Sequence, residues 1–231
     1  MEENFTIRGV AFDIDGTLYP NSRMYLASLG IVLRHWRLFR AFGAARKTVR
    51  TRHPIADLRH ETAALTAEQL GISTEEAVQR IDEVIYHRWE EVLRRVPLYP
   101  GVTELLGELR ARGLTLAAMS DFPVLSKLRL LGIEDSWDVA FSTEDVGYLK
   151  PNVEPFEELE TRMGLRSREI LYVGNSYHYD VLGAAAAGFR TAHLGGDPRK
   201  PGRADVAFRD FPTLQRWILG RLPEFQNHPD D

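Results

Sequence analysis

Short runs of apolar residues recur along the chain, and most of them are bounded by Gly, Asp, Asn or Ser. Such runs are typical of buried β-strands. They lie at residues 10–12, 114–119, 139–141, 170–173, 191–194 and 206–208. Segments with helical spacing lie between the later runs; in one of them, residues 102–112, the apolar side chains share one face before Gly113 ends the pattern. Strands that alternate with helices predict an α/β fold with a mostly parallel sheet.

One region breaks this alternation. From about residue 21 to residue 96 no segment has a convincing strand pattern. A stripe of apolar residues at helical spacing is formed by Tyr25, Leu29, Val32, Trp36 and Phe39. A second helix is expected over residues 61–70, and a third begins at Ser73, where Glu76 completes a capping box.

These patterns predict two domains. Residues 20–97 form an all-helical domain, called the cap segment below, which is inserted after the first strand. Residues 1–19 and 98–231 form the α/β core. The Pro and Gly residues at both junctions are typical of such boundaries.

Composition narrows the class of protein. The chain has 231 residues, enough for one or two domains with a real core. A net charge of -4 argues against a dedicated nucleic-acid binder, and the absence of cysteine excludes disulfides, thiol catalysis and thiolate zinc sites. The acidic start lacks the features of a signal peptide, and no apolar run approaches the ~18 residues that a membrane span needs. We expect a cytoplasmic enzyme or binding protein with no membrane partner.

Polar side chains follow the first predicted strand. In the stretch FDIDGTLYP, Asp13 and Asp15 lie two positions apart at the strand's carboxyl end, where open α/β sheets bind ligands. Two carboxylates this close repel each other and persist beside a cation or by sharing a proton. Gly16 permits a sharp turn, and Thr17 adds a hydroxyl. The alternative is a polar turn that caps the next helix.

Two further strands end in groups that suit an anion. Ser120 and Asp121 end the strand of LAAMSD, where a hydroxyl and main-chain N–H groups can hold phosphate oxygens. Lys150, in GYLKPNVEPF, is followed by the rigid Pro151 and can act as a point charge for a phosphoryl group. A helix N-cap and a solvated loop lysine are the alternatives.

The fourth strand ends in ILYVGNSYHYDVLGAAAAG. Asn175 follows the strand directly, and Asp180 leads into a helix of small residues. Helix capping and a favourable helix dipole are the alternative explanation. Because the ends of parallel strands meet at one edge of the sheet, we expect all these groups to converge. Carboxylates are the hard oxygen ligands that Mg²⁺ prefers, so the pattern predicts a phosphoryl-transfer site.

Together these motifs resemble the haloacid dehalogenase superfamily, and specifically its phosphohydrolases with a helical cap after the first strand, of the phosphoglycolate phosphatase type. The resemblance rests on AFDIDGTLYP, LAAMSD, GYLKPNVEPF and ILYVGNSYHYDVLGAAAAGF in the family's order, and it spans residues 9–214 outside the cap segment. It implies a three-layer, Rossmann-like core with an inserted helical cap.

The resemblance also implies roles for the matching residues. Asp13 is expected to attack phosphorus and form an aspartyl-phosphate. Asp15 is expected to protonate the leaving alcohol and then activate water, with Thr17 helping to place it. Ser120 and Lys150 are expected to bind the phosphoryl oxygens. The implied Mg²⁺ ligands are Asp13, the backbone carbonyl of Asp15, Asn175 and Asp180.

Asn175 departs from the family pattern, which has an acid directly after the glycine. An amide oxygen can still bind Mg²⁺, but a full negative charge is missing, so weaker metal affinity is expected. The expected substrate is a small phosphorylated metabolite. A phosphomutase of the same architecture stays open, as does a catalytically weakened relative that binds a phosphorylated ligand or a protein.

The cap segment is basic at its start. No Asp or Glu occurs between Gly16 and Ala56. The basic residues there include Arg34, Arg37, Arg40, Arg46, Lys47, Arg50 and Arg52. Such a block can attract an anionic substrate or an acidic partner. A solvated helix face opposite the Tyr25–Phe39 stripe is the simpler interpretation, and we favour it.

Overall fold

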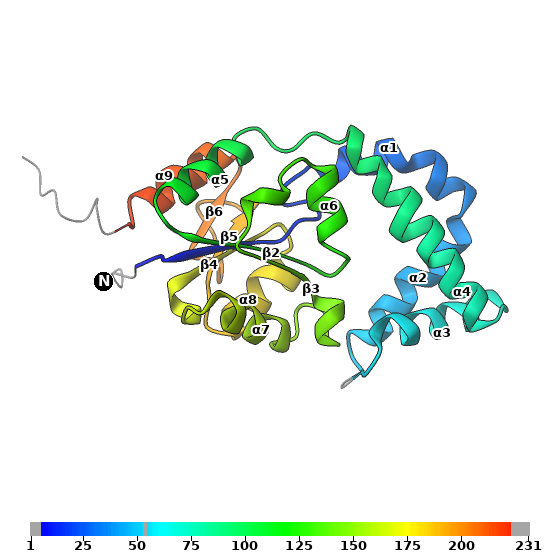
Figure 1. Cartoon of the computed structure of the whole chain (residues 1–231). Helices are drawn as coiled ribbons and strands as arrows, with labels where there is room; N and C mark the ends of the chain where they lie inside the picture. Colours follow the sequence, from blue (N-terminus) through cyan, green and yellow to red (C-terminus); the bar gives the residue numbers. More distant parts are fainter. Residues whose placement is uncertain (1–5, 53–54, 223–231) are drawn as a thin grey trace, which may run out of the picture.

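The computed structural model describes residues 6–52 and 55–222, so the ends of the expected core domain lie outside it (Figure 1). The described residues form a six-stranded sheet in the order β3-β2-β1-β4-β5-β6, in which every neighbouring pair is parallel. The strands are β1 (Gly9–Phe12), β2 (Thr115–Ser120), β3 (Val139–Ser142), β4 (Ile170–Gly174), β5 (Arg190–Leu194) and β6 (Val206–Phe208). All six predicted strands and the parallel sheet are confirmed.

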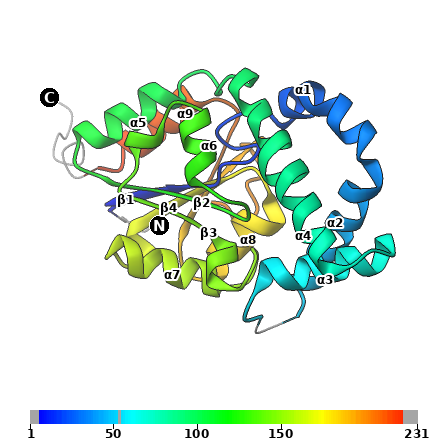
Figure 2. The same cartoon turned by 45° about the vertical axis from the view of Figure 1, so that its right-hand side comes forward.

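Helices cover both faces of the sheet and make three layers (Figures 1 and 2). One face carries α5 (Val102–Ala111), α6 (Leu125–Leu130) and α9 (Phe211–Leu219), and the other carries α7 (Glu154–Met163) and α8 (Leu182–Ala186). Successive strand residues point to opposite faces. Phe12 accordingly packs with the α5 and α9 side chains, whereas Ala11 faces α7 and α8. The three-layer α/β prediction is confirmed.

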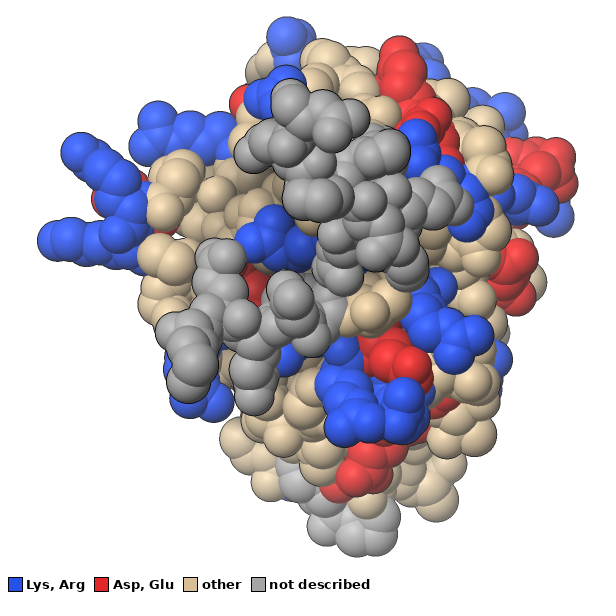
Figure 3. Space-filling view, turned by 90° about the vertical axis from the view of Figure 1, so that its left-hand side faces the viewer, with Lys and Arg blue, Asp and Glu red and all other residues tan. Residues whose placement is uncertain are grey.

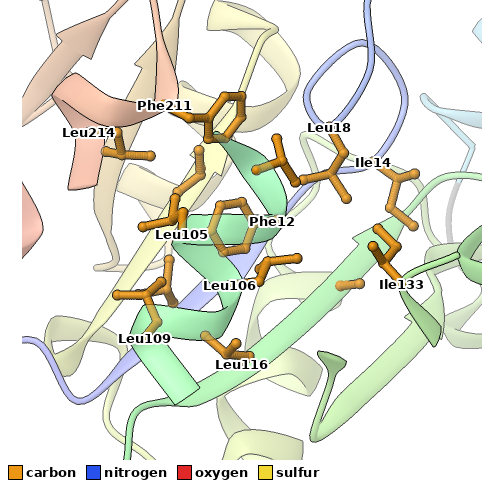
Figure 4. Close-up of a cluster of buried hydrophobic side chains, with 14 of the residues drawn as sticks. Phe12, Ile14, Leu18, Leu105, Leu106, Leu109, Leu116, Ile133, Phe211 and Leu214 are labelled. Atoms are coloured by element: carbon orange, nitrogen blue, oxygen red, sulfur yellow. The ribbon is translucent and has the colours of Figure 1, made fainter. Parts of the chain in front are cut away.

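Figure 4 shows the buried apolar side chains around Phe12, on the face of the sheet that carries α5 and α9. Leu105, Leu106 and Leu109 on α5 and Leu214 on α9 point toward its ring, and Phe12 itself is fully buried. Burying one side chain of this size stabilises the fold by roughly 1.5–3 kcal/mol. The residue before the first catalytic candidate is therefore fixed in the core, which fixes where the chain leaves β1.

In the described part of residues 20–97 the regular elements are all helices, which form a group beside the sheet (Figures 1 and 2). They are α1 (Asn21–Arg34), α2 (Trp36–Val49), α3 (Leu58–Leu70), α4 (Thr74–Ile81), a π-helix η1 (Asp82–Trp89) and a 3-10 helix η2 (Glu90–Arg95). Ser73 caps α4 by accepting from the Glu76 N–H at 3.1 Å, but the Glu76 carboxylate pairs with Arg80. The exact domain boundaries stay a prediction.

The apolar stripe lies differently from what its spacing suggested. The helix breaks at His35, between α1 and α2, and Tyr25, Leu29 and Trp36 remain more than half exposed. Met24 and Ser28 form the buried face of α1. Helical spacing identifies residues that share a face, but not which face packs against the molecule.

The surface away from the helical group is mixed in charge. Figure 3 shows the side of the molecule that lies at the left in Figure 1; its visible Lys and Arg side chains are interspersed with Asp and Glu. No helix among residues 6–52 and 55–222 is long and apolar enough to cross a membrane.

Candidate active site

The predicted site residues converge at the carboxyl edge of the sheet. Asp13 and Asp15 follow β1, Ser120 ends β2, and Asn175 follows β4. Contacts then join residues that are far apart in sequence: Lys150 Nζ lies 2.7 Å from Asp13 and 2.6 Å from Asp180. The parallel register explains this convergence, because β1 pairs with both β2 and β4.

Asp13 is a buried carboxylate between a cation and a hydroxyl. Lys150 Nζ donates to its Oδ1 at 2.7 Å, and the Thr17 hydroxyl donates to its Oδ2 at 2.7 Å. Burial raises the pKa of Asp13 to about 7, opposed by Lys150 and reinforced by the Asp180 and Asp15 carboxylates. Burial and the two neighbouring carboxylates therefore outweigh Lys150 in their effect on this pKa.

Lys150 is buried between two carboxylates and a phenol. Its ammonium donates to Asp180 Oδ1 at 2.6 Å and to the Tyr172 hydroxyl at 3.2 Å, in addition to Asp13. Burial disfavours the charged lysine, but Asp13 and Asp180 outweigh burial and hold the pKa of Lys150 well above its usual value. A fixed positive charge thus lies directly beside the Asp13 carboxylate.

Asp15 points to a different set of donors. Lys127 Nζ contacts both of its oxygens, at 2.6 and 2.5 Å, while Tyr19 OH donates to Oδ1 at 2.5 Å and Ser120 Oγ to Oδ2 at 2.6 Å. Burial alone raises the pKa of Asp15, but the Lys127 ammonium and these hydrogen bonds bring it below its ordinary value. The two aspartates have opposite pKa shifts because burial and two neighbouring carboxylates outweigh Lys150 at Asp13, whereas Lys127 and the hydrogen bonds outweigh burial at Asp15.

Sequence reasoning missed Lys127 and Tyr19. Lys127 follows the Ser120 strand and lies at helical spacing among the apolar residues Val124, Leu128 and Leu131, on the face opposite Ser126 and Arg129 in pattern. A lysine at a buried position of such a segment was the available signal. The Thr17 hydroxyl contacts Asp13 and the Asn175 side chain, and its expected help when Asp15 activates water stays a prediction.

The Thr17 hydroxyl, which contacts Asp13, also contacts Asn175. The Asn175 main-chain N–H donates to Thr17 Oγ at 3.0 Å, and the Asn175 Oδ1 lies 3.3 Å from the same hydroxyl. Asp180 is buried close by, with Oδ1 accepting from Lys150 and Oδ2 accepting from the Ser176 N–H at 2.9 Å. Asn175 and Asp180 thus flank the pair formed by Asp13 and Lys150.

The oxygen atoms at this point fit a hard divalent cation. Within the described chain the Asp15 carbonyl oxygen accepts no hydrogen bond. This carbonyl, the Asp13 carboxylate and the Asn175 amide oxygen are the ligand types that Mg²⁺ takes. Among residues 6–52 and 55–222 no three or more His, Cys, Asp or Glu side chains are grouped to hold a metal. The expected set contains only two carboxylates, so such a group is not required.

A family model of haloacid dehalogenase-like hydrolases matches residues 7–188. The chain belongs to this family. The predictions of the superfamily and of a hydrolase are confirmed.

The chain is similar in sequence to two curated phosphatases and similar in fold to a solved structure. A glyceraldehyde 3-phosphate phosphatase of Methanopyrus kandleri is 30% identical over 203 residues, covering 81% of this chain and 84% of the relative. A phosphoglycolate phosphatase of Yersinia pestis is 32% identical over 186 residues, covering 79% and 78%. The structure of a 2-haloacid dehalogenase from Pseudomonas syringae has a TM-score of 0.69 at 23% identity, over 94% of this chain and 99% of that one, which shows the shared fold.

In this haloacid dehalogenase-like hydrolase the helices beside the sheet are joined to the site by buried ion pairs. Arg46 on α2 is buried and donates to the Glu144 carboxylate and to the Asp121 carbonyl oxygen. One turn later, Arg50 pairs with Asp121 at 2.7 Å and donates to the Lys150 carbonyl oxygen. The expectation of a solvated basic face is therefore wrong for Arg46 and Arg50, although Arg34, Arg37, Arg40, Lys47 and Arg52 are exposed.

Aromatic side chains complete this junction. Phe122, in the loop after β2, packs into the cluster of the cap segment, with ring centroids 6.2 Å from Phe42 and from Trp89. The Arg46 guanidinium lies over the Phe122 ring at 4.6 Å. Arg46, Arg50 and Phe122 thus join the cap segment to the loops that carry the site, in which Asp13, Ser120 and Lys150 are all buried.

Proposed function

We propose that this hydrolase is a Mg²⁺-dependent phosphatase that cleaves a small phosphomonoester through an aspartyl-phosphate on Asp13. The observation that carries the proposal is the pair of aspartates at the end of β1, each with its own buried lysine. Asp13 contacts Lys150 and Thr17, whereas Asp15 contacts Lys127 and Ser120. One carboxylate can act as the nucleophile while the other handles protons.

The reaction has two steps. In the first, an Asp13 oxygen bonds to phosphorus and the bond from phosphorus to the leaving oxygen breaks. Asp15 is ionised in the free protein, so it takes up the proton of a phosphomonoester monoanion and passes that proton to the leaving oxygen. In the second, water bonds to phosphorus, the bond to Asp13 breaks, and the proton of the water passes to Asp15. Lys150 neutralises the phosphoryl charge, and Ser120 turns its hydroxyl from Asp15 to a phosphoryl oxygen.

Mg²⁺ is the cofactor that these residues suit. Asp13, the Asp15 carbonyl, Asn175 and Asp180 are the residues that would hold it, and Asn175 does so without a negative charge. When bound, Mg²⁺ neutralises charge on Asp13 and on the phosphoryl group. Asp180 also positions Lys150 through the 2.6 Å ion pair, so its loss is expected to affect both groups.

A small substrate is supported by the relatives and by the burial of the site. Two relatives at 30% and 32% identity are named for glyceraldehyde 3-phosphate and phosphoglycolate, which are short phosphorylated metabolites. The cap segment has to open for such a molecule to enter, and closure then excludes water from the reacting atoms. The cytoplasmic location and the absence of nucleic-acid and membrane partners stay predictions.

The test is phosphate release from 4-nitrophenyl phosphate across a Mg²⁺ titration, beside Asp13→Asn. Release that requires Mg²⁺ and is lost in Asp13→Asn is the expected result. Glyceraldehyde 3-phosphate and phosphoglycolate are then compared as substrates. Binding of these compounds without turnover at any Mg²⁺ concentration contradicts the proposal and favours a binding protein; transfer of the phosphoryl group to a sugar instead of water favours a mutase.

A further inference from the structure

Lys127 is a buried lysine outside every motif that the family resemblance uses. It lies on α6, its side chain is 3% exposed, and its ammonium contacts Asp15 at 2.5 Å and lies 4.7 Å from the centre of the Phe122 ring. Lysine is almost never fully buried unless it is paired. The pairing here is with Asp15, so the question is what this ion pair does.

Stability is a weak explanation for a buried ion pair. Removing two charges from water costs several kcal/mol per ion, and apolar side chains of similar volume are often as good or better. The neighbouring Val124 and Leu128 are buried apolar residues, so apolar side chains suit these surroundings if both members of the pair are replaced. The ammonium therefore points to a role at Asp15 beyond packing.

The geometry distinguishes Lys127 from the other two donors to Asp15. Tyr19 reaches only Oδ1 and Ser120 reaches only Oδ2, whereas Lys127 contacts both oxygens. A donor that contacts both oxygens resists rotation of the carboxylate about its Cβ–Cγ bond. Ser120, in contrast, has to leave Asp15 when its hydroxyl binds a phosphoryl oxygen.

We propose that Lys127 is a positioning residue that holds the Asp15 carboxyl group in place when Ser120 turns to the substrate. This inference rests on the proposed function. Asp15 must stay within hydrogen-bond reach of the leaving oxygen while the bond to phosphorus breaks, and a displacement of about 1 Å can cost on the order of 100-fold in rate. Two separate residues then perform the two tasks. Ser120 binds the phosphoryl group, and Lys127 keeps the Asp15 carboxyl group aligned.

The test compares substrates that depend differently on Asp15. The wild type, Lys127→Met and Lys127→Arg are assayed for kcat/KM with phenyl phosphate, whose poorer leaving group needs the proton, and with 4-nitrophenyl phosphate, which needs it less. kcat/KM reports the step in which the leaving group departs. Lys47→Met, at an exposed position of α2, is the matched control.

We expect Lys127→Met to lose about 10–100-fold with phenyl phosphate and at most about threefold with 4-nitrophenyl phosphate. Lys127→Arg retains a cation beside Asp15 and is expected to lose less, and Lys47→Met to lose nothing. In an Asp15→Asn background, Lys127→Met is expected to cause little further loss, because it acts through Asp15.

Equal losses with both substrates, or losses that add fully to those of Asp15→Asn, overturn the proposal. If circular dichroism shows that Lys127→Met is not folded, the same comparison uses Lys127→Gln. Its neutral amide is expected to replace the ammonium less completely at Asp15. A loss of kcat/KM that is equal for both substrates overturns the proposal there too. A wild type that releases no phosphate from either compound refutes the proposed function itself. An active wild type with unaffected Lys127 variants refutes the inference alone.

Discussion

The ion pair between Arg46 and Glu144 allows a quantitative test of how the cap segment is held on the core. Both residues are buried, and Glu144 also accepts from Tyr86 OH at 2.9 Å. The perturbations are Arg46→Met, Glu144→Gln and the double variant. Glu144→Gln keeps the side chain's shape and carbonyl oxygen but leaves the Arg46 cation without its main anion.

The size of the loss follows from burial. Removing one member of a buried ion pair costs about 3–5 kcal/mol. The Asp121 carboxylate also interacts electrostatically with Arg46, so the loss in Glu144→Gln is expected near the lower limit, about 3 kcal/mol. For a chain of this length each kcal/mol lowers Tm by roughly 2–4 °C, which predicts a fall of roughly 6–12 °C.

The assay is thermal and urea unfolding of the wild type and the three variants, followed by circular dichroism. The double variant should lose less than the two single variants together, by at least about 1 kcal/mol, because it contains no unpaired buried charge. Arg80→Met is the control: it breaks the exposed pair with Glu76 and should cost about 0.5 kcal/mol or less. If the loss in the double variant equals the sum of the two single losses within about 0.5 kcal/mol, the reasoning is refuted. The two charges then do not interact in the folded protein.

Three further changes test the site and the core. Asn175→Asp adds a full negative charge beside the proposed metal and should lower the half-saturating Mg²⁺ concentration by about tenfold or more. If this concentration is unchanged in the phosphate-release titration, the amide does not face the metal. Burial raises the pKa of Asp121, but Arg50, Lys150 and Arg46 together outweigh burial and hold this pKa below its usual value. The carboxylate therefore stabilises the fold above about pH 4, and this contribution is lost as the pH falls further. Asp121→Asn should therefore be less stable than the wild type in urea at pH 7, and the difference should be smaller at pH 3; an equal difference at both pH values contradicts this. Gly183→Ala adds a methyl group 2.7 Å from Phe156 Cε2 and should lower the free energy of unfolding by about 1–3 kcal/mol, and an unchanged urea midpoint contradicts that close contact.

The sequence was sufficient for the sheet and for the residues at its edge. Each strand is a compact apolar run with a clear boundary, so local pattern alone located it. Asp13, Ser120 and Asn175 follow such runs directly, and the geometry of parallel strands brings strand ends together. Their convergence therefore needed no information beyond the order of strands and helices.

Interactions that depend on which helix face packs inward were not predictable in the same way. Arg46 and Arg40 belong to the same basic block, yet Arg46 is buried against Glu144 and Arg40 is exposed. The pairing spans 98 positions, and no local pattern links the two residues. Lys127 was missed for the same reason, since its partner Asp15 lies 112 positions earlier.

The central place of β1 in the sheet bears on how the chain folds as it is made. β1 precedes the other strands in sequence, and its two neighbours in the sheet are β2 and β4. The Thr17 hydroxyl contacts Asn175, which lies 158 positions later in the chain. Contacts between such distant positions form slowly because a long loop must close first. A growing chain can complete the helices of the cap segment, which are continuous in sequence, long before β4 exists. Asp13 therefore lacks its contact with Lys150, and Thr17 its contact with Asn175, until most of the protein has been synthesised.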